Sequence, residues 1–366
     1  MGLLANPPTI STPTVYFGQL SDIGRNTGGG ILASTGTVTG LIGDVPMPTV
    51  HNFSFGIQQQ ISRGLIFDVS YVGSITRNFL WQRNINAVPL GSTHIDINPQ
   101  NIDPTVPTRA LNPNFLRPFQ GYGNINMFEF GSTSSYNSLQ FSMNQRFGRS
   151  ATWGISYTLS KALRASETDT TGVHPFYSPR NFNYGPLDYD RTHVLNLRYN
   201  WTIPQWGKKY NWGHARHITD GWQLSGITRM QSGAPFTPGF SLVSGLDITG
   251  TPTLGARLNV LDPAAPPETR FIPPTRGQIG NVGEGILRRP GFTNWDLSVY
   301  RNLRLGEGKQ LQLRVESYNT PNSAQWNSID QTARFDAQNN QINSIFLEPL
   351  TARSPRRVQL AMRLTF

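Results

Sequence analysis

The feature that most constrains the fold is a strict alternation of apolar and other residues, which recurs along the chain and continues to its last residue. In the final segment, RRVQLAMRLTF at 356–366, the alternating apolar residues are Val358, Leu360, Met362, Leu364 and Phe366. A side-chain period of two is typical of a β-strand that has one apolar face and one face of a different character. The segment is therefore predicted to be a strand.

The same alternation predicts about nine strands in all. One example is YNSLQFSMNQRF, in which Leu139, Phe141 and Met143 alternate with glutamine, serine and asparagine. The GWQLSGITRM segment is the weakest, because Gly226 and Thr228 dilute its apolar face. The predicted strands before the final one lie at 51–61, 65–73, 136–147, 151–161, 192–203, 221–230, 294–303 and 310–317.

The connections between these strands alternate in length. Tight turns are expected at 62–64, 148–150 and 306–309, and a moderate one at 204–219. The other connections are long excursions at 85–123, 165–188, 232–290 and 320–352, which hold most of the proline and irregular polar sequence. Such alternation of short and long connections is typical of antiparallel hairpins that have tight turns at one end of the sheet and long loops at the other.

Two all-β architectures accommodate such strands. In a soluble sandwich the apolar face packs on a second sheet and the polar face meets water. In a transmembrane β-barrel the apolar face meets lipid and the polar face lines the lumen. The long connections favour the barrel, since long loops are uncommon in compact domains. The polar face also carries mid-strand charges that a lumen tolerates: Asp68, Arg198, Asp296, Arg314 and Arg363.

Tryptophan positions also favour the barrel. Trp153, Trp201, Trp222 and Trp295 are expected near strand ends on the apolar face. Transmembrane barrels concentrate aromatic residues there, in girdles at the two membrane interfaces. We therefore predict these four residues to be girdle residues.

Composition narrows the possible chemistry. The chain has no cysteine, which excludes disulfides and cysteine-based metal or redox sites. Its net charge is +10, but the basic residues form no run, so nucleic acid is not expected as a partner. No catalytic, cofactor or metal site is predicted. The acidic LDYDRTH segment at 187–193 could support acid–base chemistry, although an ion-paired strand entrance is favoured.

Residues 51–366 are thus predicted to form a partial barrel, and residues 1–50 an external loop or the remnant of an upstream strand. The first clear strand, at 51–61, runs inward, toward the tight-turn rim, as does the last. Single-chain bacterial barrels have an even number of strands. The absence of a recognisable signal peptide also favours a chain that is part of a longer protein, since an outer-membrane protein must cross the inner membrane. The sequence is therefore expected to be the C-terminal part of a larger protein.

Several segments, in order, resemble a known family. HNFSFGIQQQISRGLIFDVSYVGSITRNFLWQRNIN, YNSLQFSMNQRFGRSATWGISYTLSKAL, GPLDYDRTHVLNLRYNWTIP and LQLRVESYNTPNSAQWNS are similar to the C-terminal barrel half of TonB-dependent outer-membrane receptors. The similarity covers about residues 48–366 and is greatest to the Oar-like group, which has an N-terminal carboxypeptidase-regulatory-like domain. The resemblance implies a 22-stranded barrel with an N-terminal plug. Of this, nine or ten strands would be present and about thirteen absent.

The resemblance also implies function and partners. It implies a non-enzymatic barrel of the Gram-negative outer membrane that takes up ligand through a plugged lumen, using energy delivered by TonB through the missing N-terminal region. Outer-membrane lipid, lipopolysaccharide and the barrel-assembly machinery would be partners, and the substrate stays open. In the family the assembly machinery reads a terminal phenylalanine with alternate apolar residues, a signal that Val358, Leu360, Met362, Leu364 and Phe366 match. Two alternatives remain: a secreted or surface adhesion or carbohydrate-binding module, and a passive porin-like pore.

Overall fold

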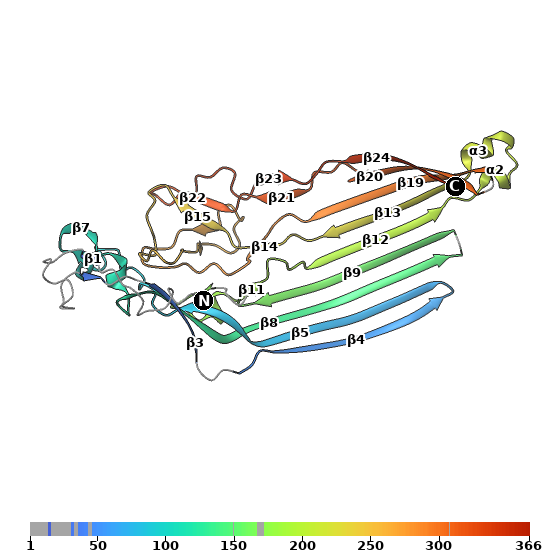
Figure 1. Cartoon of the computed structure of the whole chain (residues 1–366). Coiled ribbons are helices and arrows are strands. Elements are labelled where there is room, and N and C mark those ends of the chain that lie inside the picture. Colours follow the sequence, from blue (N-terminus) through green and yellow to red (C-terminus); the bar gives the residue numbers. More distant parts are fainter. Residues whose placement is uncertain are drawn as a thin grey trace.

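The computed structural model describes residues 14–15, 31–32, 36–42, 46–148, 150–166, 172–306 and 308–366. Its main feature is one curved twelve-stranded sheet (Figure 1). Every segment predicted to be a strand forms one of the long strands of this sheet. They are β4 (Thr49–Ser62), β5 (Leu65–Asn84), β8 (Tyr122–Phe147), β9 (Ala151–Arg164), β12 (His193–Thr202), β13 (Trp222–Gln231), β19 (Phe292–Gly306), β20 (Lys309–Tyr318) and β24 (Arg357–Thr365).

The long strands pair antiparallel with their neighbours in chain order, from β4 at one edge to β24 at the other. Three short strands add to the sheet at its loop end. β3 (Gly36–Leu41) pairs parallel with β8, β10 (Gly172–Val173) pairs parallel with β5, and β11 (Gly185–Pro186) pairs antiparallel with β9. The expectation for residues 1–50 falls largely outside the described residues.

The two ends of the sheet differ as the loop lengths predict. Tight turns join β4 to β5, β8 to β9 and β19 to β20 at one end, where the chain also finishes (Figure 1). Gly64 has a φ of +81° in the first of these turns, and a Cβ there would lie 2.5 Å from the Arg146 carbonyl oxygen. The turn therefore requires glycine.

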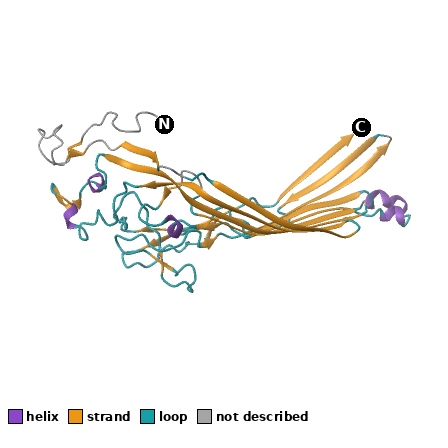
Figure 2. Cartoon of the chain, turned by 90° about the horizontal axis from the view of Figure 1, so that it is seen from below, coloured by secondary structure: helices purple, strands orange, loops and turns teal. Residues whose placement is uncertain are grey.

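The connection from β12 to β13 is more ordered than a turn. It contains α2 (Trp206–Lys209), the 3₁₀ turn Gly213–Ala215 and α3 (Arg216–Thr219), which project beyond the strand ends (Figure 2). The Asp220 carboxylate accepts hydrogen bonds from the Gly207 and Lys208 backbone N–H groups at 2.9 and 3.0 Å. No helix among the described residues is long and apolar enough to cross a bilayer.

The long connections gather at the other end and contain a hydrophobic core of their own. Its buried residues come from two connections, 232–291 and 319–356, and include Leu258, Val282 and Phe335. Short strand pairs hold it together: β14 (Pro235–Phe236) with β18 (Leu287–Arg288), β15 (Gly239–Leu242) with β22 (Thr332–Phe335), β16 (Asn259–Val260) with β17 (Phe271–Ile272), and β21 (Trp326–Ile329) with β23 (Pro349–Ala352). The sequence predicts irregular polar loops here, and this packing is the main difference.

Strands β5 and β8 extend well beyond the others toward the loop end. Their ladder continues past an irregularity between Thr76 and Phe79, where Asn78 has a φ of +56°. Beyond it, the Trp81 indole N–H donates to the Glu129 carboxylate at 2.7 Å, and Trp81 is buried with Ala165. In the first long connection, β6 (Ile102–Asp103) pairs with β7 (Val106–Ala110).

Candidate functional site

Strand register divides the side chains of the sheet into two faces. Cross-strand partners point to the same side of a sheet, and successive residues point to opposite sides. One row across the strands is polar: Ser142, Ser156, Asn196, Arg229 and Asn294. The adjacent row is largely apolar: Met143, Ile155, Leu197, Thr228 and Trp295.

The apolar face is uncovered in the described structure. Leu360 and Met362 on β24 are 76% and 74% exposed, and Leu313 and Val315 on β20 are also exposed. In a sandwich these residues would be buried against a second sheet. The exposure of a contiguous apolar surface instead fits a sheet solvated by lipid.

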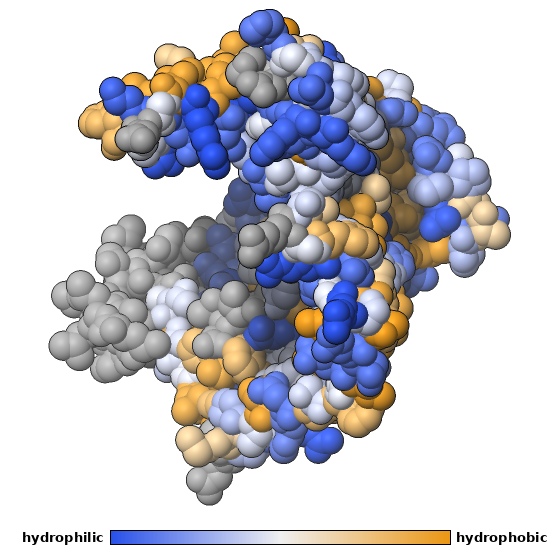
Figure 3. Space-filling view, turned by 90° about the vertical axis from the view of Figure 1, so that its right-hand side faces the viewer, coloured by the Kyte–Doolittle hydropathy of each residue, from blue (hydrophilic) through white to orange (hydrophobic). Residues whose placement is uncertain are grey.

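The polar face lines the concave side of the sheet. Viewed along the strands, hydrophilic side chains border the hollow and hydrophobic ones gather on the outer side of the arc (Figure 3). The mid-strand charges identified in the sequence lie on this face. Asp296 is opposite Ile227, Arg314 is opposite Tyr300, and Arg363 is opposite Gln312.

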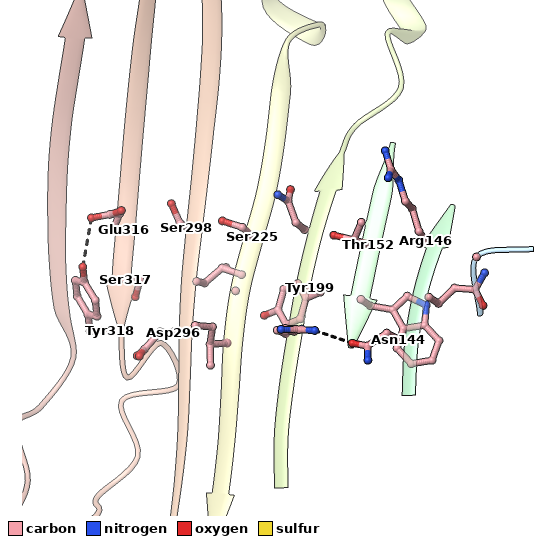
Figure 4. A pocket seen from close by; sticks show the side chains of 18 of the residues that line it. Asn144, Arg146, Thr152, Tyr199, Ser225, Asp296, Ser298, Glu316, Ser317 and Tyr318 are labelled. Carbon is pink, nitrogen blue, oxygen red and sulfur yellow. Dashed lines mark hydrogen bonds between the residues drawn. The ribbon is translucent and has the colours of Figure 1, made fainter. Parts of the chain in front are cut away.

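A hollow of 670 Å³ crosses the concave face from the turn end of β8 and β9 to the loop end of β19 and β20 (Figure 4). Its lining includes polar side chains from six strands, among them Asn144, Arg198, Asp296 and Glu316. The Arg198 Nη2 donates a hydrogen bond to the Asn144 Oδ1 at 2.7 Å, and the Tyr318 hydroxyl donates to Glu316 at 3.3 Å. The lining also includes apolar side chains such as Ile66 and Ile227, so the hollow combines apolar surface with a few spaced donors and acceptors, as solute-binding sites commonly do.

The Arg198 side chain occupies its position because β9 has a glycine opposite it. A Cβ on Gly154 would lie 2.6 Å from the Asn144 Oδ1 and 2.7 Å from the Arg198 Nε. The guanidinium therefore lies against the backbone of β9, where it can reach Asn144. The alternating pattern predicts that Arg198 faces the lumen, but it does not predict this contact.

The four tryptophans lie on the apolar face, as the alternation requires. Trp153 pairs with Tyr199, and Trp201 with Leu224, near the turn end of the sheet. Trp222 pairs with Arg301, whose guanidinium carbon lies 5.5 Å from the indole centroid. Trp295 lies near the loop-end start of β19. Their role as girdle residues stays a prediction.

The residues predicted to form the assembly signal lie along β24 and just after it. Val358, Leu360, Met362 and Leu364 pair in register with Ser317, Val315, Leu313 and Leu311 of β20. They therefore form one apolar row on the outer face, and Phe366 is 92% exposed. Whether the assembly machinery reads this row stays a prediction.

The acidic LDYDRTH segment forms an ion-paired strand entrance, as the sequence favours. The Asp190 side chain is 1% exposed, and its Oδ2 accepts a hydrogen bond from the Arg288 Nη2 at 2.6 Å. Its Oδ1 accepts another from the Ala162 backbone N–H at 2.7 Å. These contacts tie the start of β12 to β9 and to the loop of residues 232–291. The sequence does not identify Arg288 as the partner.

A buried histidine at the loop end has no signal in the sequence pattern. His174 packs against Phe182 with ring centroids 4.6 Å apart, and its Nδ1 accepts a hydrogen bond from the Phe176 backbone N–H at 3.2 Å. Its Nε2 has no partner among the described residues. Burial, together with the positive charges of Arg257 and Arg83, lowers the pKa of His174 to about 4.

The described residues contain no group of three or more acidic or histidine side chains that could bind a metal ion. The chemistry of the concave face is that of amides, hydroxyls, guanidinium groups and a few carboxylates such as those of Asp296 and Glu316. These groups bind and orient solutes through hydrogen bonds and charge.

A family model described as an outer membrane beta barrel domain matches residues 4–359. No curated protein matches the chain. Among solved structures, the outer membrane transporter YddB from Escherichia coli aligns with 91% of this chain and 34% of its own, at 11% identity and a TM-score of 0.47. The ferripyoverdine receptor of the outer membrane of Pseudomonas aeruginosa aligns with 87% of this chain and 27% of its own, at 10% identity and a TM-score of 0.41. The chain thus spans between about a quarter and a third of the length of these structures.

Proposed function

The chain belongs to the family of outer-membrane β-barrel domains, and from that premise we propose that it forms part of the wall of a TonB-dependent uptake barrel. The protein resides in the outer membrane. One observation carries the proposal: a single sheet has an uncovered apolar outer face and a concave polar face with a hollow of 670 Å³. The ordered resemblance of residues 48–366 to such receptors supports it.

In this proposal the loop end faces outward and the tight turns face the periplasm. Ligand binds first at the folded loops and then passes along the polar wall. TonB acts through a plug domain that precedes the barrel strands in receptors of this kind. The role is transport and not catalysis. Membership of the Oar-like group is part of the proposal, as is the interpretation of residues 51–366 as part of a larger barrel.

The remaining partners in this proposal would contact the outer face. Acyl chains solvate the rows that contain Leu197 and Leu313, while Trp153, Trp201, Trp222 and Trp295 lie at the two interfaces with lipopolysaccharide or phospholipid headgroups. The outward row of Val358, Leu360, Met362, Leu364 and Phe366 is the surface offered to the barrel-assembly machinery. Replacing Phe366 with alanine is expected to lower the amount of heat-modifiable protein in outer membranes, whereas Arg363→Gln is not.

The central test is the environment of adjacent residues on opposite faces. Because the chain has no cysteine, single-cysteine variants carry one label each. We expect fluorophores at Leu197→Cys and Leu313→Cys to be quenched by lipid-borne quenchers, and those at Asn196→Cys and Gln312→Cys by aqueous iodide. A dry protein environment at the leucines would contradict the proposal.

A passive pore is distinguished by conductance. Uptake through a plugged lumen predicts a low, ligand-sensitive conductance of the intact protein in planar bilayers. Steady, unselective conductance that is independent of TonB would favour the pore.

A further inference from the structure

A second hollow, of 730 Å³, lies at the loop end of the concave face. Its lining brings together three arginines from separate parts of the chain: Arg229 on β13, Arg353 after β23, and Arg357 at the start of β24. Register places Arg229 opposite Asn196 and Arg357 opposite Tyr318, both on the polar face. Arg229 and Arg357 therefore belong to the lumen side and not to the lipid side, and Arg353, from the loop before β24, lines the same hollow.

One aromatic ring, that of Phe292, contacts two of these arginines. The guanidinium carbons of Arg229 and Arg353 lie 5.6 and 4.7 Å from the centroid of Phe292, which lines the same hollow. Stacking on an aromatic face orients a guanidinium while leaving its N–H groups free to donate. Phe292 thus keeps two positive groups together at a site where they repel each other.

The three arginines have no ion-pair partner in the part of the chain that the structure describes. The ion pairs found there involve other arginines. Arg229 donates to the Gln231 side chain at 2.8 Å, and Arg357 donates to the Ser354 hydroxyl at 2.9 Å. The one carboxylate in the lining, Asp296, instead accepts hydrogen bonds from neutral asparagine N–H groups at 2.8 and 3.0 Å.

More positive charge lies next to this hollow. Burial lowers the pKa of Arg191, and the charges of Arg288, Arg289 and Arg353 lower it further, against the raising effect of Asp190. Arg289 also has a buried Nε without a partner among the described residues. Among the described residues, Arg288 is the one member of this group that forms an ion pair with a carboxylate. The loop end of the polar wall therefore has a concentrated positive potential.

We propose that this arginine hollow binds a small, water-soluble ligand that carries several anionic groups, either carboxylates or phosphates. Guanidinium groups form strong, often bidentate hydrogen bonds with both kinds of oxyanion. A multiply charged ligand neutralises several arginines at once and removes their mutual repulsion. The inference rests on the proposed function, because it takes the polar face to bound a water-filled lumen that solutes enter from the loop end.

The test uses the protein purified from outer membranes in a zwitterionic detergent, with citrate and tripolyphosphate as probes in isothermal titration calorimetry. We expect at least one probe to bind and its affinity to fall as salt is raised. A charge-assisted hydrogen bond contributes roughly 1.5–3 kcal/mol, so Arg353→Gln and Arg357→Gln should each weaken binding about tenfold or more. Binding of citrate alone assigns a carboxylate ligand, and binding of tripolyphosphate alone assigns a phosphate ligand.

Arg363→Gln is the matched control. Arg363 lies on the same strand and the same face as Arg357, six residues nearer the turn end, which is roughly 20 Å along the strand. Its replacement should change binding less than about twofold, since exposed charges that far apart are largely screened. Heat-modifiable migration on gels checks that each variant is folded.

The proposal is overturned if neither probe binds the folded wild-type protein, or if Arg363→Gln weakens binding as much as Arg357→Gln does. Either result leaves the uptake barrel itself intact, provided that the labels at Leu197 and Asn196 report lipid and water. If the label at Leu197 does not report lipid or the label at Asn196 does not report water, the proposed function is wrong, whatever the binding measurements show.

Discussion

The opposition of the two faces can be tested with one pair of adjacent residues on β9. Ile155 lies between Met143 and Leu197 on the apolar face. Ser156, the next residue, faces the other side, opposite Asn196. Replacing each in turn with arginine introduces the same side chain at nearly the same depth, so the two variants differ mainly in the face that receives the charge.

The structure sets the expected magnitudes. Ile155 is midway between Ala151 and Leu159, about 13 Å along the strand from each, which places it near the middle of an apolar band ~25 Å tall. An arginine facing lipid at that depth costs roughly 2–4 kcal/mol. Ser156 borders a hollow of 340 Å³ on the polar face, where an arginine finds space and water. Ser156→Arg should therefore change stability by less than about 0.5 kcal/mol.

The assay is equilibrium unfolding by guanidinium chloride of the protein reconstituted in phosphatidylcholine vesicles, followed by tryptophan fluorescence. Since every 1.4 kcal/mol is about tenfold, Ile155→Arg should shift the folding equilibrium by about 30-fold to 1000-fold. Equal destabilisation by the two variants, or a larger effect of Ser156→Arg, would refute the face assignment. A neutral effect of Ile155→Arg would show that this residue meets water.

Three further outcomes are expected. Gly154→Val should displace Arg198 from its position against β9, seen as a change in the accessibility of a label at the hollow, whereas Gly283→Val, at a loop position where a Cβ meets nothing within 4 Å, should not displace it. Asp190→Ala should destabilise the loop end by about 2–3 kcal/mol. This is less than the roughly 3–5 kcal/mol expected on breaking a fully buried ion pair, because Arg288 keeps some solvent contact. The effect would be measured as faster proteolysis of the loops while the barrel stays folded. The pKa of His174 is about 4 in the folded protein and about 6.5 in the unfolded chain, so the unfolded chain binds more protons between these two pH values. The stability of the loops should therefore fall as the pH drops from about 6.5 to 4. His174→Gln should remove this pH dependence, measured as the rate of proteolysis of the loops.

Alternation predicts the sheet well because a barrel strand needs only local information. Each side chain between Leu195 and Trp201 faces either lipid or the lumen according to its position alone, and the register observed with β9 and β13 keeps that order. Loop length likewise predicts which end of the sheet carries the elaborate connections. The polar face of the candidate site could therefore be predicted residue by residue.

The contacts within the site could not be predicted, because they join residues far apart in the sequence. Nothing near Asp190 indicates that Arg288 neutralises it, and nothing near Phe292 indicates that Arg229 and Arg353 stack on it. Arg301 also lies on the apolar face, which a pattern of alternation alone would forbid. Its position beside Trp222, at the strand end, lets the charge reach the interface.

The parallel pairing of β15 with β22 has a consequence for engineering this barrel. Residues 239–242 and 332–335 belong to different hairpins, yet they share a ladder and a common core around Phe335. A chimera that exchanges only one of the two loops with a homologous barrel would strip the other of its strand partner and expose its apolar side. Engineering of ligand specificity at this end of the barrel must therefore exchange both segments together.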